Sequence, residues 1–576
     1  MANNGATIEI SCVNTGNKLQ AVFGMSLRDL MKKAGIKSVE DPKTGKKYPV
    51  LAALVDNKLK DLSYQLVFSQ EIEFIGINHP DGRRTYVRSM SFLLQKAIRE
   101  LYPNKFLKID HSLPAGLYCE IKELNFDERG AHYEYFATDA ELERIKEKMQ
   151  EYIESDLPFI RKKMAVDEAE EIFIANHQPE KAALFRSLGR FTCSVYCLEN
   201  QIDTFHGPLA PSTGSLGVFD ITGFNKGFCL QLPPFGEADK VMPMRRQSKI
   251  AAALKEYSDW CDVFGASGVG TLNQEVLKGN SVNIINIAEA LHERKYSNVA
   301  DMIFSERNRI KIVFIAGPSS SGKTSSSLRL ALQCKVLGLN PKVMELDNYF
   351  VNRENTPKDE NGDYDFEALQ AMDIPFLNKQ LNQLLQGEEI EIPKYNFKTG
   401  ERTFSGAKMK LDEKDILIME GIHALNPDMV PDVDQSKVFR LYVSALTSLN
   451  LDENNTISTS DNRLLRRMVR DNSTRGINPE ETIMRWNSVR RGENKNIFPF
   501  QENADFLFNS ALLYELPLLK YFAEPLLRRI QPNSPAYCEA VRLLKFLDFV
   551  IALQPSEINA IPPTSIMREF IGGQTL

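Results

Sequence analysis

The sequence predicts a multidomain α/β protein whose C-terminal half is a doubly wound parallel sheet. Three observations lead to this fold class. The chain has 576 residues, which is more than one hydrophobic core can organise. From residue 301 onward, short apolar runs alternate with helical patterns, as a parallel sheet requires. A glycine-rich phosphate-binding pattern stands between the first of these strands and the helix that follows it.

Four segments follow one another along the chain. The first alternates short strands with one helix that begins at Ser26, which predicts a β-grasp domain; the second is an α+β unit with a helix over 89–101. The third is mostly helical, and Gly265, Gly268 and Gly270 predict a loop inside it. The fourth carries the parallel sheet. The predicted boundaries are 1–75, 76–235, 236–300 and 301–576.

Composition indicates an ordinary cytoplasmic protein. Charged residues make up 25 % of the chain with a net charge of −6, which argues against bulk binding of nucleic acid. The eight cysteines are scattered, as in a reducing compartment. The N-terminus lacks the pattern of a signal sequence, and no apolar run approaches the ~18 residues that span a bilayer. We therefore expect a cytoplasmic location and no membrane partner.

The phosphate-binding pattern is Gly-Pro-Ser-Ser-Ser-Gly-Lys-Thr at 317–324, between a predicted strand over 311–316 and a predicted helix over 324–337. A loop that leads into a helix N-terminus aims backbone N–H groups and the helix dipole at one anion. A chance match in a serine- and glycine-rich turn is the alternative, and the flanking strand and helix argue against it. Lys323 would reach the β- and γ-phosphates of a nucleotide, and the Thr324 hydroxyl would hold Mg²⁺. A phosphate loop alone is compatible with ATPases, GTPases and kinases. The residues expected to bind the nucleotide are Gly317, Ser319, Ser320, Ser321, Gly322, Lys323 and Thr324.

Two acidic residues follow further predicted strands. Asp347 comes directly after a strand over 343–346, and Glu420 after a strand over 416–419. Strand ends of one edge face the ligand crevice in a doubly wound sheet, so Asp347 could accept a proton from a substrate hydroxyl. Glu420 takes the place of the acidic residue that orders Mg²⁺ and its waters. The alternatives are a turn aspartate and a surface glutamate.

An arginine run begins at Arg463 and ends at Arg475. On a helix, Arg463, Arg467 and Arg470 fall on one face. Such a run is often a solvated face or a nucleic-acid patch. Beside a phosphate loop, it predicts a lid whose arginines stabilise charge on a transferred phosphate and exclude water.

With these motifs in order, the half from about 300 to 576 resembles the uridine kinase and phosphoribulokinase family of P-loop kinases. The resemblance implies an enzyme that transfers phosphate from ATP, with Mg²⁺, to a nucleoside 5′-hydroxyl, with Asp347 as the general base and Lys323 on the phosphates. It also implies that Arg470 and Arg475 contact the ATP phosphates and that Arg467 lies on the substrate side. Glu367 resembles the family residue that touches ribose; Tyr395, Phe397 and Arg402 resemble its nucleoside pocket.

Two departures from the family pattern concern recognition of the nucleobase. Uridine kinases carry a histidine five residues after the pocket tyrosine, where this chain has Gly400. They carry another arginine just after the Arg-Gly of the lid, where this chain has Ile477. The residues for phosphoryl transfer are therefore present, whereas two residues with which uridine kinases recognise the acceptor are absent. We therefore expect a broader or different nucleoside range than that of a strict uridine and cytidine kinase.

Residues from about 5 to 235 resemble the N-terminal region of threonyl-tRNA synthetase, its ubiquitin-like TGS domain followed by its editing domain. The matching segments are 52–62, 86–97 and 206–214. The editing enzyme needs two histidines four apart on a helix, and a cysteine and a histidine four apart on a loop. Those four places here hold Arg88, Phe92, Phe205 and Leu209. We expect the editing chemistry to be lost and its pocket to be partly filled.

Three functions stay open from the sequence alone. The first is a nucleoside kinase with two appended synthetase-like domains. The second is a kinase for another small-molecule hydroxyl, as relatives of phosphoribulokinase are. The third is an RNA-binding or regulatory protein that ATP switches, in which Asp347 would have no role as a base. RNA or a regulatory ligand could bind the N-terminal domains, and a homo-oligomer is compatible with the sequence.

Overall fold

The computed structural model describes residues 6–576 except 43, 128–129, 136, 236, 245–246, 359–361, 363 and 448. The described N-terminal part begins with a five-stranded mixed sheet in the order β2-β1-β7-β5-β6, and α1 covers it through Leu27 and Leu30. Ser26 caps this helix by accepting from the backbone N–H of Asp29, as the sequence predicts. The elements are β1 (Thr7–Cys12), β2 (Asn17–Val22), α1 (Leu27–Lys33), β3 (Ser38–Glu40), β4 (Lys47–Pro49), β5 (Ala52–Val55), β6 (Lys58–Lys60) and β7 (Gln70–Ile75).

The next unit packs two helices against an antiparallel sheet in which β9 pairs with β8, β10 and β15. The helix expected over 89–101 begins at Pro80 and is buried on nearly every side, because a sheet, α3 and other chain segments surround it. The elements are α2 (Pro80–Leu101), β8 (Lys105–Leu113), β9 (Gly116–Asp127), β10 (Gly130–Tyr135), α3 (Asp139–Glu154), β14 (Asp220–Phe224) and β15 (Gly227–Gln231). A three-stranded antiparallel sheet joins them, with β11 (Ile160–Ala165), α4 (Val166–Ala175), α5 (Pro179–Ser187), β12 (Thr192–Leu198) and β13 (Gln201–Asp203).

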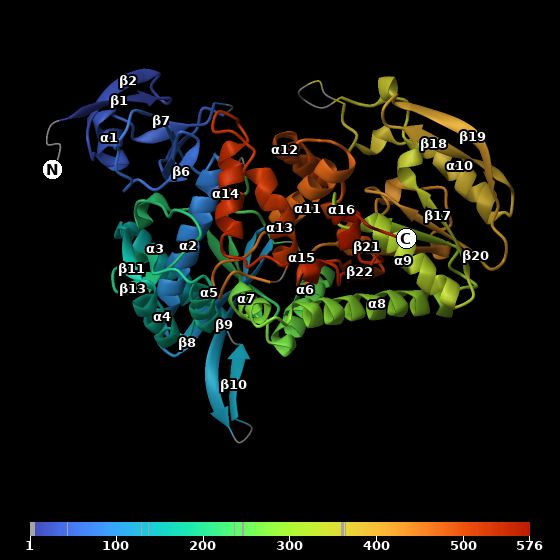
Figure 1. Ribbon diagram of the computed structural model, residues 1–576, viewed down its shortest axis with the longest axis horizontal. Helices are drawn as coiled ribbons and strands as arrows, with labels where there is room; N and C mark the ends of the chain where they lie inside the picture. Colours follow the sequence, from blue (N-terminus) through green and yellow to red (C-terminus); the bar gives the residue numbers. More distant parts are fainter. Residues whose placement is uncertain are drawn as a thin grey trace.

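Three helices lead from this unit to the parallel sheet: α6 (Ser248–Phe264), α7 (Val269–Leu277) and α8 (Ser281–Ser305). Gly265 ends α6 in the left-handed conformation, at a φ of +78°. The loop expected through Gly270 is shorter than predicted, because α7 begins at Val269 and includes Gly270. All three helices share one hydrophobic core with the parallel sheet, and α8 runs beneath it in Figure 1.

The C-terminal half contains a five-stranded parallel sheet in the order β17-β20-β16-β21-β22, which confirms the predicted fold class. Alternate residues of β16 face opposite cores: Val313 and Ile315 join one, Ile312 and Phe314 the other. The strands of this sheet are β16 (Ile312–Ala316), β17 (Asn340–Glu345), β20 (Asp415–Glu420), β21 (Val438–Ser444) and β22 (Phe506–Asn509). Strands β18 (Ile390–Asn396) and β19 (Glu401–Met409) form a separate antiparallel hairpin. The helices are α9 (Lys323–Val336), α10 (Ile374–Leu385), α11 (Thr459–Thr474), α12 (Pro479–Asn496), α13 (Glu515–Leu527), α14 (Tyr537–Leu547), α15 (Pro555–Ile558) and α16 (Met567–Ile571).

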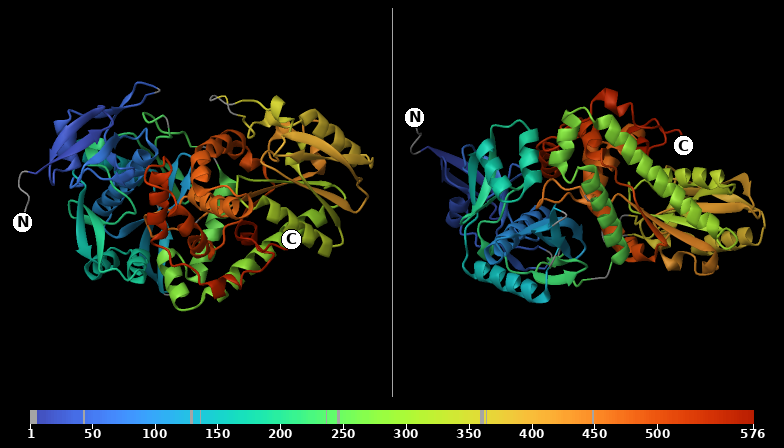
Figure 2. Two further views of the ribbon diagram at one scale, coloured as in Figure 1. Left: turned by 45° about the horizontal axis from the view of Figure 1, so that its top comes forward. Right: turned by 90° about the horizontal axis from the view of Figure 1, so that it is seen from below.

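The N-terminal domains and the parallel sheet lie at opposite ends of an elongated molecule, with α11 to α14 between them (Figure 2). Helix α14 contacts both β6 and α12, so the C-terminal segment bridges the two ends. Within the described residues, no helix combines the length and the apolar character needed to cross a bilayer.

Candidate active site

The phosphate-binding pattern forms the turn between β16 and α9, as the sequence predicts. Gly317 packs against β21: a Cβ there would lie 2.0 Å from the Val443 carbonyl oxygen. Gly322 caps α9 at a φ of +87°, which disfavours any residue with a side chain. Both glycines are therefore required by the backbone path of the loop.

Polar side chains hold the outer carbonyl groups of this loop. Arg463 donates from Nη1 to the Ser319 carbonyl at 3.0 Å, and Ser510 donates to the Ser321 carbonyl at 2.5 Å. Arg466 reaches the Ser320 carbonyl at 3.4 Å. The C=O and N–H of a trans peptide point in opposite directions, so the N–H groups that follow these carbonyls face the other way. Of these, the Ser321 N–H donates within the loop to the Pro318 carbonyl at 3.3 Å, so the Ser320 and Gly322 N–H groups are the candidate donors to an anion at the α9 N-terminus.

Lys323, Asp347 and Glu420 come together at the carboxyl ends of neighbouring strands. Burial raises the pKa of Asp347 to about 6 and the pKa of Glu420 to about 7, while the Lys323 charge lowers both. Asp347 lies in the single turn Leu346–Tyr349 that follows β17, and Glu420 is the last residue of β20. The side chains predicted from three separate motifs therefore interact electrostatically in one site.

The oxygen donors of this site fit Mg²⁺. The Thr324 hydroxyl donates to Glu420 Oε1 at 2.7 Å, so the two predicted metal residues are adjacent. A hydroxyl and a carboxylate are hard oxygen ligands of the kind that Mg²⁺ takes beside phosphate oxygens. Burial is the main cause of the raised pKa of Glu420, because it disfavours the ionised carboxylate. A divalent cation held by this carboxylate would favour its ionised form.

The arginine helix α11 divides into two sets of side chains. Arg463 and Arg466 are fully buried and pair with Glu493 and Glu515. Their first role is to fix the loop and α11 together, so Arg463 does not belong to a mobile lid face with Arg467 and Arg470 as the spacing predicts. The reason is Glu493 on α12, whose position no sequence pattern reveals.

The other three arginines surround Asp471. Arg467 lies 3.2 Å from Asp471 and donates from Nη1 to the Ser319 hydroxyl at 2.9 Å. Arg470 pairs with Asp471 at 3.0 Å, and Arg475 pairs with the same carboxylate at 3.5 Å. Arg467 thus contacts the phosphate loop directly, whereas Arg470 and Arg475 are held beside it by one carboxylate. The Arg475 charge nevertheless lowers the pKa of Asp347.

Sequence reasoning missed two C-terminal side chains at the N-terminus of α9. Glu569 on α16 accepts from the Ser325 hydroxyl at 2.6 Å and from the Ser325 backbone N–H at 3.4 Å. Gln574 also donates to the Ser325 hydroxyl, at 2.8 Å. A carboxylate therefore stands where the helix terminus favours an anion. No motif marks these residues, because they lie some 250 positions after the loop.

The residues predicted for the acceptor side are only partly gathered. Tyr395 and Phe397 pack on Phe350, three residues after Asp347, with ring centroids 5.5 and 6.0 Å from it. The Tyr395 hydroxyl is buried without a hydrogen-bond partner among the described residues. Glu367 is close enough to Arg467 for that charge to lower its pKa, although burial raises the pKa overall.

Arg402 has a different environment from Tyr395 and Phe397. It pairs with Asp373 at 2.8 Å and lies over the Phe376 ring at 4.7 Å. Asp373 caps α10, so these contacts join the β18–β19 hairpin to that helix. These contacts give Arg402 a structural role in this region.

Arg353 fills the space beside Gly400 and was not singled out by the sequence. A Cβ on Gly400 would lie 2.7 Å from Arg353 Cβ and 2.8 Å from its Nε, and the φ of Gly400 is +77°. Arg353 also donates to the Phe397 carbonyl, and its charge lowers the pKa of Tyr395 against the opposing effect of burial. Where the family pattern has a histidine, this chain brings a guanidinium from another loop.

The pocket of the synthetase-like unit is filled by aromatic rings. Phe92 is fully buried, and its ring centroid lies 5.4 Å from Phe205 and 6.0 Å from Phe159. Arg88 is buried as well and donates from Nε to the Pro208 carbonyl at 3.1 Å. Across the part of the chain that the structure describes, no three His, Cys, Asp or Glu side chains are arranged to hold a metal ion.

Comparison with known proteins finds two separate similarities. The profile of the phosphoribulokinase / uridine kinase family matches residues 312–513. Uridine kinase from Bacillus pumilus is 31 % identical over 202 residues, which are 35 % of this chain and 87 % of the relative. Threonine–tRNA ligase from Rubrobacter xylanophilus is 29 % identical over 206 residues, 36 % of this chain. The match spans only 29 % of that ligase.

A solved structure of a possible uridine kinase from Bacillus stearothermophilus is 17 % identical, with a TM-score of 0.26, over 37 % of this chain and 98 % of that one. The two sequence similarities confirm the predicted fusion of a kinase-family half with a threonyl-tRNA synthetase-like half.

Proposed function

The chain belongs to the phosphoribulokinase / uridine kinase family through its C-terminal half, and we propose that it transfers the γ-phosphate of ATP to the 5′-hydroxyl of a nucleoside. One observation carries the proposal: Lys323, Thr324, Asp347 and Glu420 meet at one edge of the parallel sheet. A protein that ATP only switches needs the phosphate loop and the metal residues. It does not need a half-buried carboxylate at Asp347 with a pKa raised to about 6.

In this proposal the loop N–H groups and Lys323 bind the ATP phosphates, and Thr324 and Glu420 hold Mg²⁺. The bound ion would neutralise charge on the transferred phosphate. Asp347 accepts the proton of the acceptor hydroxyl as that oxygen attacks the γ-phosphorus. Arg467 is already at the loop, and Arg470 and Arg475 turn from Asp471 to the phosphates.

The acceptor would lie between Asp347 and the aromatic group of Phe350, Tyr395 and Phe397. A nucleobase can stack on such rings. Glu367, beside Arg467, is suited to accept from ribose hydroxyls. Arg353 is the group we propose to read the base, because a guanidinium donates to carbonyl oxygens and ring nitrogens and cannot accept. Arg402 supports this region by holding the hairpin on α10.

Arg353 is also compatible with a second class of acceptor. Arg353 also suits a phosphate or carboxylate, for which guanidinium is the best side-chain partner. A phosphorylated sugar, as in the phosphoribulokinase branch of the family, is therefore the alternative substrate.

For the N-terminal half we propose a structural and regulatory role without editing. The division at residues 75, 235 and 300 stays part of this proposal, as do the cytoplasmic location and a homo-oligomeric assembly. The close packing of the Phe92 and Phe205 rings, with the metal ligands replaced, supports a loss of the editing reaction. Binding of RNA to this half is the alternative, and an RNA-dependent change in ATP turnover would reveal it.

Release of ADP in the presence of single candidate acceptors tests the proposal. Uridine, cytidine, adenosine, guanosine and inosine form one set, and a pentose phosphate forms the other. We expect turnover with at least one nucleoside and little ADP without an acceptor. Turnover only with the sugar phosphate would select the second class. ADP release that no acceptor stimulates would contradict a kinase.

A further inference from the structure

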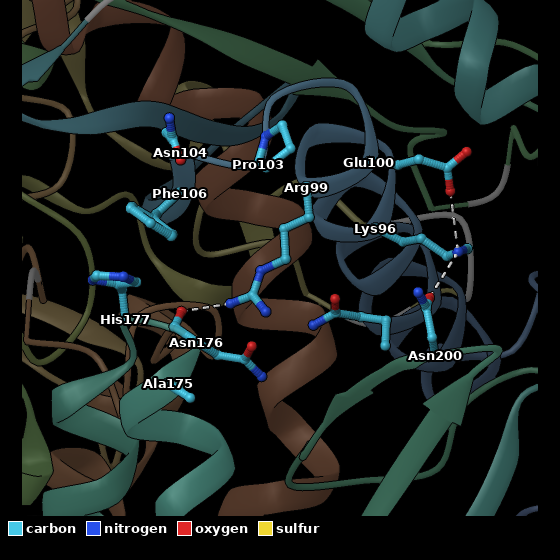
Figure 3. Close-up of a pocket in the computed structure, with 11 residues that line it drawn as sticks. Lys96, Arg99, Glu100, Pro103, Asn104, Phe106, Ala175, Asn176, His177 and Asn200 are labelled. Carbon is cyan, nitrogen blue, oxygen red and sulfur yellow. Dashed lines mark hydrogen bonds and ion pairs between the residues drawn. The ribbon is translucent and has the colours of Figure 1, made fainter.

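A polar cavity of about 360 Å³ lies in the synthetase-like unit, about one to two turns along α2 from Phe92 at the editing position. Its walls come from the last turns of α2, the start of β8, the turn between α4 and α5, and the start of β13. Figure 3 shows Arg99 reaching into its middle, with Phe106 and His177 on one side and Lys96 and Glu100 on the other. The volume falls in the range of small-molecule sites.

The two cationic side chains at this cavity differ in their partners, and the carboxylates of Glu100 and Glu199 lie on the side of Lys96. Lys96 is neutralised, because it pairs with Glu199 at 2.8 Å and with Glu100 at 3.4 Å. Arg99 donates from Nη2 to the Asn176 carbonyl at 2.5 Å, and no ion pair of its guanidinium is found among the described residues. An arginine that faces a cavity with only a carbonyl partner is prepared to bind an anion.

A buried amide points to the same conclusion. Gln201 is 9 % exposed, and its Nε2 has no hydrogen-bond acceptor in the described part of the chain. A buried donor without a partner costs about 1–3 kcal/mol. A ligand oxygen in the cavity would remove that cost. Gln201 Nε2 and the Arg99 guanidinium are both donors, so they select a ligand that accepts.

The opposite wall carries two aromatic rings that pack on each other. The Phe106 and His177 rings lie 4.1 Å apart between centroids, at an interplanar angle of 33°. The amide side chains of Asn104, Asn176 and Asn200 also line the cavity and can both donate and accept. A flat ring with polar edges and one anionic group matches this combination.

We propose that this cavity binds a nucleoside monophosphate, with the phosphate on Arg99 and Gln201 and the base beside Phe106 and His177, and that its occupancy regulates the kinase half. The binding claim stands on the cavity alone. The regulatory claim rests on the proposed kinase function, of which a nucleoside monophosphate is the product.

The walls of the cavity continue into a buried network that joins the two halves. Two residues after Gln201, Asp203 pairs with Lys181, and both are fully buried. Asp203 also accepts from Gln178 at 3.1 Å and from Asn454 of the kinase half at 3.1 Å. Lys181 lies 3.5 Å from Asp452 as well. Binding that tightens β13 or the α4–α5 turn therefore acts on a network that contains the segment 449–458.

Glu453 in this segment caps a helix of the other half. The N-cap residue of α5, Gln178, makes no side-chain cap, and the Glu453 carboxylate instead accepts from the backbone N–H of Glu180 at 2.8 Å and of Lys181 at 3.3 Å. The turn before α5 carries Asn176 and His177 of the cavity wall. The segment 449–458 leads directly into α11, whose arginines hold the phosphate loop. A route thus runs from the cavity to the active site.

Isothermal titration of the full chain tests the binding claim. The probes are the 5′-monophosphates of uridine, cytidine, adenosine and guanosine, with inorganic phosphate and a short oligoribonucleotide as separate arms. We expect two sites for the nucleotide that the kinase produces, one in the acceptor pocket and one in this cavity. Arg99→Gln should weaken the cavity site roughly 10- to 100-fold, since it removes a charge-assisted contact. Arg144→Gln, which changes an exposed arginine of α3, should bind as the wild type does.

Gln201→Glu provides a second variant of nearly unchanged size. It places a carboxylate where the anion would lie and should also remove the cavity site. Circular dichroism and thermal unfolding verify that both variants are folded. Equal nucleotide binding by wild type, Arg99→Gln and Gln201→Glu would overturn the proposal. If inorganic phosphate binds as tightly as every nucleotide, the cavity does not recognise a nucleobase. If the oligoribonucleotide binds more tightly than the monophosphates, the ligand is RNA and the proposal of a free nucleotide is wrong.

Reciprocity tests the regulatory claim. If the sites are coupled, a nonhydrolysable ATP analogue must change the cavity affinity by the same factor as the nucleotide changes the affinity for the analogue. We expect this mutual change, roughly 5-fold or more, in the wild type and its absence in Arg99→Gln. Cavity binding without any mutual change would overturn regulation while leaving the binding claim intact. Because neither titration needs turnover, failure of the proposed kinase reaction would be seen separately.

Discussion

The Thr324 hydroxyl donates to the Glu420 carboxylate at 2.7 Å, although the two residues are 96 positions apart. One belongs to the phosphate loop after the central strand β16, and the other ends the neighbouring strand β20. Parallel strands bring their carboxyl ends to one edge, so this contact follows from the sheet order. It joins the loop that binds phosphate to the acidic residues expected to hold the metal and to remove the proton.

Lys323→Ala and Asp347→Asn should each reduce phosphoryl transfer about 100-fold or more, because one removes a phosphate contact and the other the base. Steady-state assays with saturating ATP and the preferred acceptor measure the effect. Lys335→Ala, on the exposed end of the same helix α9, and Asp428→Asn, at an exposed position, are the matched controls and should keep full activity. Near-full turnover by Asp347→Asn would show that another group is the base.

The pH dependence of turnover should reflect Asp347, whose pKa is raised to about 6 by burial. The base must be ionised, so kcat/KM, which reports the free enzyme, should rise with pH through about 6 and reach a plateau above it. The sign for stability is opposite. Between the usual value of 3.8 and about 6, the folded protein holds a proton that the unfolded chain releases, so stability falls as pH rises. Thermal unfolding of Asp347→Asn should show a smaller fall over this window. A kcat/KM that is flat from pH 5 to 8 would contradict this assignment.

Glu569→Gln should strengthen the binding of Mg²⁺ and ATP. The Glu569 carboxylate lies at the N-terminus of α9, where it repels phosphate and competes for the Ser325 donors. Interactions of one charge with a helix terminus are worth about 0.3–1 kcal/mol, so we expect an affinity gain of roughly 2- to 5-fold. Titration with a nonhydrolysable analogue measures it, with the exposed Glu413, two residues before β20, changed to Gln as the control. Weaker binding would mean that Glu569 helps to form the site.

Acceptor choice should depend on Arg353. Replacing it with Ala removes the guanidinium beside Gly400 and Tyr395, and should raise the KM of the preferred acceptor by roughly 10-fold or more. The KM for ATP should stay unchanged. Competitive turnover with the five nucleosides tests the expectation of a broad or altered range. Exclusive preference for uridine and cytidine in the wild type would show that the base is read as in strict uridine kinases despite Gly400 and Ile477.

The synthetase-like unit should contain no tightly bound zinc and should not deacylate mischarged tRNA. Arg88, Phe92, Phe205 and Leu209 stand at the four ligand positions, and the aromatic rings fill the space between them. Elemental analysis of the purified protein and a deacylation assay with charged tRNA provide the check. One zinc per chain would refute this prediction. The described residues contain no group of His, Cys, Asp or Glu side chains arranged to hold a metal ion elsewhere.

The phosphate loop, Asp347 and Glu420 were predictable because each follows an apolar strand of the parallel sheet, and strand ends converge by topology. The division of the arginine helix was not. Arg463 and Arg467 have the same periodicity, and only the tertiary partner Glu493 makes Arg463 a buried structural residue. Glu569 and Arg353 escaped prediction for the same reason, since their partners Ser325 and Gly400 lie elsewhere in the chain. Sequence patterns capture local periodicity, whereas these contacts are long-range.

The most direct measurement of the central claim is identification of the phosphorylated product. Wild type and Asp347→Asn are incubated with ATP, Mg²⁺ and the nucleoside that stimulates most ADP release, and the products are analysed by mass spectrometry and phosphorus NMR. The proposal predicts a nucleoside 5′-monophosphate in amounts equal to the ADP formed by the wild type, and almost none with Asp347→Asn. ADP without a phosphorylated nucleoside, or equal product from the two proteins, would contradict it.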